Sequence, residues 1–227
     1  LDVMVAVDLS GTGRDDVLLC IGDNRTAYRY GRLYRFLSTG GDSYRVYPPD
    51  DLGPAIGGGI AVGRLGSEHA DAKCIVFGNE AGQVIALDGN LAEIWKVDLP
   101  DHGPVLSQPA IGDVNDDGRQ EVVVARTGGF VYAIDGDTGE LLWRVPTPVS
   151  VIGPTAYREH VFGPGVALLP GSGHLYCVIL STADTPSGQR GHLWIIDCGV
   201  TNTDDHSRYD WPQYQQNARR SGRSGES

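Results

Sequence analysis

Short runs of apolar residues alternate with turns rich in glycine, aspartate and proline along most of this chain. The clearest unit runs from Glu121 to Trp143. It predicts a strand over 121–126, a hairpin at Gly128-Gly129, a strand that ends at Asp135, and a strand that carries Trp143. No helical periodicity separates these strands, which indicates an all-β fold.

This unit recurs along the chain with a period of about 45 residues. A second copy runs from Cys74 to Trp95, a first copy begins near Val5, and a blurred fourth copy runs from about Thr155 to Cys198. Four short strands per repeat predict the blades of a β-propeller, about four of them. We expect residues 1–200 to form these repeats, with blades near 1–50, 51–100, 101–150 and 151–200, and residues 201–227 to form a polar tail anchored by Trp211 and flexible at its end.

The third copy opens with a run of oxygen-bearing side chains around a glycine turn. Asp113, Asn115 and Asp117 alternate along the chain, and Gly118 follows them directly. Such a run bends the backbone so that alternate residues converge on one point, and calcium takes six to eight oxygen ligands. We therefore expect a calcium site formed by Asp113, Asn115, Asp117, the Arg119 carbonyl and Glu121.

Two other interpretations of this loop were weighed. An EF-hand needs a glutamate at position twelve and helices on both sides, but position twelve is Val124 and a β-branched run precedes it. The second alternative is an acidic turn without metal, in which Asp and Asn side chains bond their own backbone. That alternative stays open.

The same frame occurs once more in the first copy, with a lower charge. Asp8, Ser10, Thr12, Arg14 and Asp16 fill the five positions. A second calcium ion and a metal-free turn are equally compatible with these residues. The second copy has Gly66, Ser67 and Glu68 in place of the acids, so no metal is expected there, and the fourth copy has lost the loop.

Two families share these motifs. The segment 109–121 resembles the FG-GAP repeat, also called the integrin α-type or VCBS-like repeat. The segment 133–143 is similar to the tryptophan-docking repeat of quinoprotein-type (PQQ-like) propellers. The resemblance implies a complete ring of seven or eight blades, and metal loops that brace blades without performing chemistry. Because four repeats are fewer than these families use, further blades of the same or another chain are expected to complete the ring.

Composition and charge limit the classes of partner that this chain is expected to bind. The chain has 227 residues and a net charge of −11, which disfavours nucleic acid and anionic membranes because phosphate binding needs a basic surface. No apolar run is long enough for a transmembrane helix, so we expect no membrane insertion in this segment. Cys177 and Cys198 bracket one hairpin and form a candidate disulfide if the compartment is oxidising, whereas Cys20 and Cys74 are expected to be buried thiols.

No catalytic motif stands out. The vicinal cysteine pair usual in quinone-dependent dehydrogenases is absent, and Gly57-Gly58-Gly59 opens no helix, so we interpret it as turn material. The sequence therefore predicts a non-catalytic, calcium-braced scaffold that is extracellular, periplasmic or at the cell surface, with a protein or glycan partner. The alternatives are a calcium-dependent polysaccharide lyase and a subunit of a larger redox or surface complex.

Overall fold

The computed structural model describes residues 3–23, 30–38, 43–48, 53–67, 69–100, 103–147, 150–152, 155–157, 165–185 and 188–201. All regular elements in these ranges are β-strands. Within the same ranges, no helix long and apolar enough to cross a membrane is found. The tail predicted over 201–227 lies outside the described residues, apart from Thr201.

The strands form four main antiparallel sheets, which follow one another along the chain. The first contains β1 (Val3–Val7), β2 (Asp16–Asp23), β3 (Tyr30–Phe36) and β4 (Tyr44–Tyr47). The second contains β5 (Ile56–Leu65), β6 (His69–Asn79), β7 (Gln83–Leu87) and β8 (Glu93–Asp98). The third contains β9 (Ala110–Gly112), β10 (Glu121–Arg126), β11 (Phe130–Ile134) and β12 (Leu141–Pro146). The fourth contains β15 (Val166–Gly171), β16 (His174–Thr185) and β17 (Gly188–Thr201), and a small separate pair contains β13 (Ser150–Ile152) and β14 (Thr155–Tyr157).

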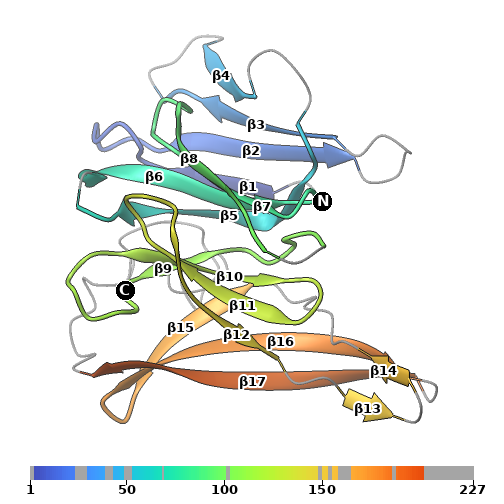
Figure 1. Cartoon of the computed structure of the whole chain (residues 1–227). Helices are drawn as coiled ribbons and strands as arrows, with labels where there is room; N and C mark the ends of the chain where they lie inside the picture. The colour runs from blue at the N-terminus through green and yellow to red at the C-terminus, as the bar shows by residue number, and fades with distance from the viewer. Residues whose placement is uncertain are drawn as a thin grey trace.

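These sheets stack face to face in chain order, from the first at the top of Figure 1 to the fourth at the bottom. Within each sheet, strands pair in sequence order as a meander. Neighbouring sheets meet through their first strands and those next to them, because β1 and β2 contact β5, β5 contacts β9, and β9 and β10 contact β15. First strands that converge while the later strands splay outward are the arrangement of propeller blades around an axis. The predicted all-β propeller fold is confirmed.

The core lies between the sheets, and β10 shows why. All six residues of this strand are buried, so both of its faces are covered. Val122 and Val124 belong to a cluster shared with the first and second sheets, whereas Val123 and Ala125 belong to a cluster shared with the fourth. Because side chains alternate between the faces of a strand, a continuous valine run serves two blade interfaces at once.

The glycine triplet corrects the sequence interpretation. Gly57 and Gly58 lie inside β5, not in a turn. A Cβ at Gly57 would lie 2.1 Å from the Val105 carbonyl oxygen, and one at Gly58 would lie 1.9 Å from the Leu106 carbonyl oxygen. The Gly58 N–H donates to that same oxygen at 2.8 Å. Glycine is required here because β5 runs directly against the backbone that leads into the third sheet.

Substitution of Gly58 by alanine tests this close approach. We expect Gly58→Ala to destabilise the protein by about 1–3 kcal/mol, because the new methyl group must push the two backbones apart. Urea unfolding followed by circular dichroism measures the change. Gly173→Ala is the matched control for the added methyl group, since nothing lies within 4 Å of its Cβ position, although its positive φ of 80° adds a small strain of its own. Equal stabilities of Gly58→Ala and wild type would contradict the packing role.

The fourth sheet departs from the expected pattern. Among the described residues it has three strands instead of four. The polar segment 181–190 lengthens the hairpin of β16 and β17, because Ala183 pairs with Arg190 and Thr185 with Gly188. All four cysteines are free thiols, and Cys20, Cys74 and Cys177 are buried, as expected for small apolar side chains in a core.

Candidate metal site

The loop between β9 and β10 is organised by Asp113. Its buried carboxylate accepts the N–H groups of Asp116 at 2.7 Å and Gly118 at 2.9 Å, and that of Asn115 at 3.4 Å. Asp116 and Gly118 both have positive φ, 65° and 83°. These contacts wrap the loop around one carboxylate, which is the geometry that the D-x-N-x-D-G run predicts.

Glu121 lies at the base of this loop with only 1% of its surface exposed. Its carboxylate accepts the Val114 N–H at 2.9 Å. Burial is the main cause that raises the pKa of Glu121 to about 8; the nearby Asp117, Asp113 and Asp135 carboxylates contribute to this rise, and the Val114 hydrogen bond opposes it. Within the described part of the chain, no cationic side chain pairs with Glu121. A buried carboxylate of this kind either holds a proton or needs a cation.

Asp117 points toward a different partner. Its carboxylate pairs with the Arg119 guanidinium at 2.6 Å and accepts the Arg119 N–H at 2.8 Å. Asn115 donates to Asp117 at 3.0 Å. Among the described residues, no three His, Cys, Asp or Glu side chains converge closely enough to hold a metal ion. The buried Glu121 carboxylate, which has no cationic partner, is therefore suited to bind a metal cation. The Asp117 carboxylate could bind the same cation only if the Arg119 guanidinium moved away from it.

The equivalent loop of the first copy has its own internal cation. Asp8 accepts the N–H groups of Thr12 at 3.1 Å and Gly13 at 2.6 Å, as Asp113 does in the third copy. Asp16, at the position of Glu121, is buried and accepts from the Arg35 Nε at 3.0 Å. Burial alone would raise the pKa of Asp16, but hydrogen bonds from Ser38 and Arg35 outweigh it and hold that pKa below its ordinary value.

Arg35 also bonds beyond its own loop. Its guanidinium donates to the Ser10 hydroxyl at 2.6 Å and to the Gly89 carbonyl of the second sheet. Arg14 is exposed and takes no part in these contacts. The guanidinium therefore occupies the place beside Asp16 and Ser10 that the sequence analysis reserved for a second ion.

Strand register explains why only one loop has this cation. Arg35 on β3 pairs with Leu18 on β2. In the third repeat, the equivalent pair is Ala133 on β11 and Val123 on β10, so alanine stands where the first repeat has Arg35. Alanine cannot neutralise Glu121. The sequence analysis missed Arg35, because its relation to Asp16 becomes visible only once β2 and β3 are paired.

The second copy, which lacks the acids, uses its loop as a donor to the third blade. The Ser67 N–H and hydroxyl donate to Asp137 at 2.8 Å and 2.9 Å, and the Gly66 N–H donates to the Gln120 carbonyl at 3.1 Å. Arg119 approaches the same Asp137 carboxylate at 3.4 Å. The loop of the second repeat is thus linked to the third repeat through Asp137 and Gln120.

Tryptophan docking joins the second blade to the third. Trp95, on β8, is 7% exposed and its indole N–H donates to the Gly136 carbonyl at 2.9 Å. A Cβ at Gly139 would lie 2.9 Å from the indole ring, so only glycine lets the ring lie flat against this turn. Asp135 fixes the turn by accepting the N–H groups of Asp137 and Thr138. The structure therefore shows the blade contact that the tryptophan-docking resemblance implies.

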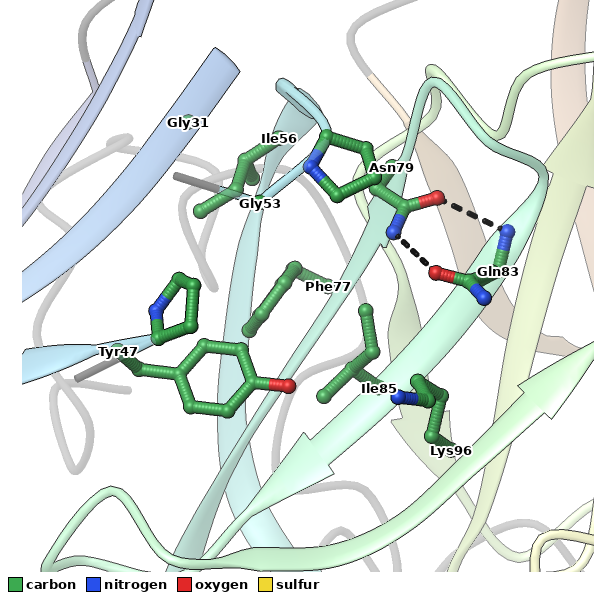
Figure 2. Close-up of a pocket in the computed structure, with 11 residues that line it drawn as sticks. Gly31, Tyr47, Gly53, Ile56, Phe77, Asn79, Gln83, Ile85 and Lys96 are labelled. Atoms are coloured by element: carbon green, nitrogen blue, oxygen red, sulfur yellow. Dashed lines mark hydrogen bonds between the residues drawn. The ribbon is translucent and has the colours of Figure 1, made fainter. Parts of the chain in front are cut away.

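A pocket of about 160 Å³ lies between the first and second blades. Figure 2 shows Tyr47 and Phe77 on its wall with Ile85, and their rings meet edge to face at 6.1 Å. Asn79 and Gln83 bond each other at its rim, and Lys96 lies beside Ile85. The pocket is mainly apolar, and the Tyr47 hydroxyl and the Lys96 ammonium both interact with the Glu93 carboxylate, outside its lining.

Comparison with known proteins gives one family and several distant structures. The PQQ_2 family model, described as outer membrane protein assembly factor BamB, matches residues 39–184. No curated protein is significantly similar to the chain. Among solved structures, BBS1N in complex with ARL6DN is 16% identical over 86% of this chain and 54% of its own, with a TM-score of 0.47, so this chain spans about half the length of that relative. BamB from Moraxella catarrhalis is 16% identical over 85% of this chain and 67% of its own, with a TM-score of 0.39.

A europium-containing methanol dehydrogenase is 13% identical over 80% of this chain and 36% of its own, with a TM-score of 0.41. The FG-GAP resemblance finds no counterpart among these matches, whereas the quinoprotein-type resemblance does. Since the family model covers more than half of the sequence and the docked Trp95 has the expected geometry, the chain belongs to the PQQ_2 family of β-propellers, whose model is described as outer membrane protein assembly factor BamB.

Proposed function

We propose that this chain is a non-catalytic propeller scaffold that works outside the cytoplasm and binds a protein partner. The family description, an outer membrane protein assembly factor, supports both the location and the protein partner. The observation that carries the proposal is the use of the buried polar side chains. In the described part of the chain, several of these side chains, such as Arg35, Gln108 and Arg126, join one blade to the next instead of converging on a pocket.

Four side chains show the pattern. Arg126 donates to the carbonyl groups of Leu99, Pro100 and Gly103, which connect the second blade to the third. Gln108 donates to the Ile60 carbonyl of β5. Trp95 and Arg35 bond the following blade in the same way. A catalytic site needs titratable groups aimed at a shared substrate position, and these groups instead satisfy backbone carbonyls between sheets.

We propose further that calcium binds the third loop and not the first. The support is the contrast between Glu121, buried without a cation, and Asp16, which has Arg35. Asp113, Asn115, Asp117, the Arg119 carbonyl and Glu121 would hold the ion, which would supply the positive charge that the loop lacks. Arg119 competes for Asp117, so binding requires its guanidinium to move away.

Calcium is expected to raise the melting temperature of the wild-type protein. With a Kd of roughly 10⁻⁴ to 10⁻³ M, millimolar calcium stabilises by about 1 kcal/mol. For a chain of this size the shift is about 2–4 °C. Differential scanning calorimetry with EGTA and with CaCl₂ measures it. Arg119→Ala should enlarge the shift, because it removes the competitor, and Glu121→Gln should abolish it. If none of the three proteins changed its melting temperature between EGTA and CaCl₂, calcium would be removed from the proposal.

The pH dependence without calcium supplies the control. Because the folded pKa of Glu121 lies near 8 and its ordinary value is 4.5, the folded state binds the proton more tightly than the unfolded state. Stability should therefore fall as pH rises from about 4.5 to about 8, by about 1.4 kcal/mol per unit from this group. Glu121→Gln lacks this component, so the difference between the two proteins in EGTA isolates it.

The scaffold role is tested by crosslinking in the native host. A photo-reactive amino acid at Lys96, whose side chain is 43% exposed beside the pocket, should yield a specific protein adduct. The matched control is Leu142, 41% exposed on β12 and away from the pocket. Calcium-dependent formation of unsaturated product from polygalacturonate would instead show catalysis and contradict the proposal.

A further inference from the structure

The pocket between the first and second blades has the size of one aromatic ring. Its volume is about 160 Å³, and an engineered apolar cavity of about 150 Å³ binds benzene. Its floor is apolar and buried, because Phe77 and Ile85 are 2% and 3% exposed. Figure 2 shows the side chains of Tyr47, Phe77 and Ile85 turned toward one another. The pocket therefore has room for one ring-sized group.

The walls of the pocket favour an aromatic occupant. The Tyr47 and Phe77 rings meet edge to face at 6.1 Å, and this geometry places the positive edge of one ring against the negative face of the other. A third ring in the pocket can make the same kind of contact with both. Pro48 and Pro54 add two further apolar rings to the lining.

Both blades fix the backbone that forms one wall of the pocket. The Gly31 N–H of the first blade donates to the Gly53 carbonyl at 2.8 Å, and the Glu80 N–H of the second blade donates to the Ala55 carbonyl at 2.9 Å. Gly31 allows this close approach, because a Cβ there would lie 2.8 Å from the Ile56 nitrogen. A pocket that is formed before its ligand arrives costs little reorganisation on binding.

The rim of the pocket carries more negative than positive charge. Glu93 and Asp98 are both exposed on β8. Glu93 accepts the Tyr47 hydroxyl at 2.8 Å, and Asp98 accepts the Gln83 side-chain amide at 3.0 Å. Lys96 lies 3.8 Å from Glu93, whereas no cationic side chain pairs with Asp98 among the described residues. This rim, on a chain of net charge −11, complements a positively charged ligand.

We propose that the pocket holds an aromatic side chain from a basic segment of the partner protein, whose Lys or Arg residues lie against Glu93 and Asp98. This inference rests on the proposed scaffold function and names the chemistry that the partner presents. A neutral aromatic molecule would use the walls and leave the rim carboxylates without a role, whereas a basic peptide uses both. An aromatic anchor in a pocket with a polar rim is the usual form of a binding hot spot.

Binding of short peptides to the 227-residue chain tests the site. The probe is acetyl-Gly-Lys-Phe-Lys-Gly-amide, and NMR signals of the Ile56 and Ile85 methyl groups report entry of its ring. Both signals should shift saturably, whereas those of Ile134, buried in the third blade, should not. The matched peptide with Ala in place of Phe should bind at least about tenfold more weakly. Equal binding of the two peptides, or no shift of Ile56 and Ile85, would overturn the proposal.

A rim variant tests the recognition of charge without touching the core. Asp98→Lys should weaken binding of the basic peptide by about two- to fivefold and strengthen binding of the same peptide with Glu in place of Lys. Glu140→Lys makes the same change of charge on the third blade, where Glu140 is exposed, and should leave both affinities at the wild-type level. Equal effects of the two variants would show that net charge alone attracts the peptide and would overturn the proposal.

A floor variant tests occupation of the pocket itself. Ile85→Phe places a ring in the pocket from below and should abolish both peptide binding and the shift of Ile56. Circular dichroism verifies that the variant is folded, and Asp98→Lys decides the question if it is not. Binding of free phenol to the wild type as tightly as the basic peptide would assign the pocket to a small molecule and overturn the proposal.

Crosslinking at Lys96 separates this inference from the scaffold function. An adduct that forms as efficiently in the Ile85→Phe background as in the wild-type background would overturn the pocket inference and leave the scaffold function standing. An adduct that the filled pocket suppresses would support both. Absence of any adduct at Lys96 in the wild-type background would contradict the scaffold function, and the inference with it.

Discussion

Replacing Arg35 with leucine is expected to lower the free energy of unfolding by about 3–5 kcal/mol. The substitution leaves Asp16 buried with 1% exposure and without the guanidinium that neutralises it. It also removes the contacts to Ser10 and to the Gly89 carbonyl, which connect the first blade to the second. Urea unfolding of the purified variant measures the loss.

A double-mutant cycle separates the charge from the packing. Asp16→Asn combined with Arg35→Leu should recover part of the stability, since no uncompensated charge then remains. Because the folded pKa of Asp16 is depressed, the contribution of the pair is present above about pH 4 and is lost as the pH falls through the folded pKa. Additive effects of the two substitutions would show that Asp16 and Arg35 do not act together.

Replacing Trp95 with alanine is expected to cost about 3–5 kcal/mol. The ring fills the space against Gly139, and its N–H satisfies the Gly136 carbonyl, so the variant loses packing and leaves a buried acceptor unpaired. Chemical denaturation measures the change, and a lower slope would reveal blades that no longer unfold together.

Trp143 provides the matched comparison. It occupies the equivalent position on β12 but is only partly buried, against the fourth sheet. Trp143→Ala should therefore cost clearly less than Trp95→Ala. Equal losses would mean that the docking geometry of Trp95 adds nothing beyond the removal of an aromatic ring.

The sequence was sufficient for the features that local chemistry determines. The three valines within 121–126 predict a strand because β-branched residues favour strands. The alternating oxygen-bearing side chains before Gly118 predict the loop that wraps around Asp113. Trp95 and the following Asp135 turn resemble a docking repeat, and the structure joins them. In each case the deciding residues lie within one repeat or at fixed places in successive repeats.

The features that escaped prediction depend on register or on neighbouring blades. Arg35 neutralises Asp16 because β2 and β3 pair with a particular offset, which the sequence does not display. Gly57 and Gly58 were interpreted as a turn because glycine signals both flexibility and close approach, and only the adjacent backbone of Val105 and Leu106 distinguishes these cases. Calcium binding at either loop is still a prediction from the sequence, and the Arg35 guanidinium beside Asp16 disfavours it at the first.

The backbone between Gly103 and Gln108 ties several blades at once. Val105 donates to Asn79 of the second sheet, Thr127 of the third sheet donates to Pro104, and Val166 of the fourth donates to Gln108. None of these three blades can detach without losing hydrogen bonds to this segment. Amide hydrogen exchange should consequently find β6, β10 and β15 opening as one cooperative unit, so that the second to fourth blades behave as a single foldon despite their repetitive sequence.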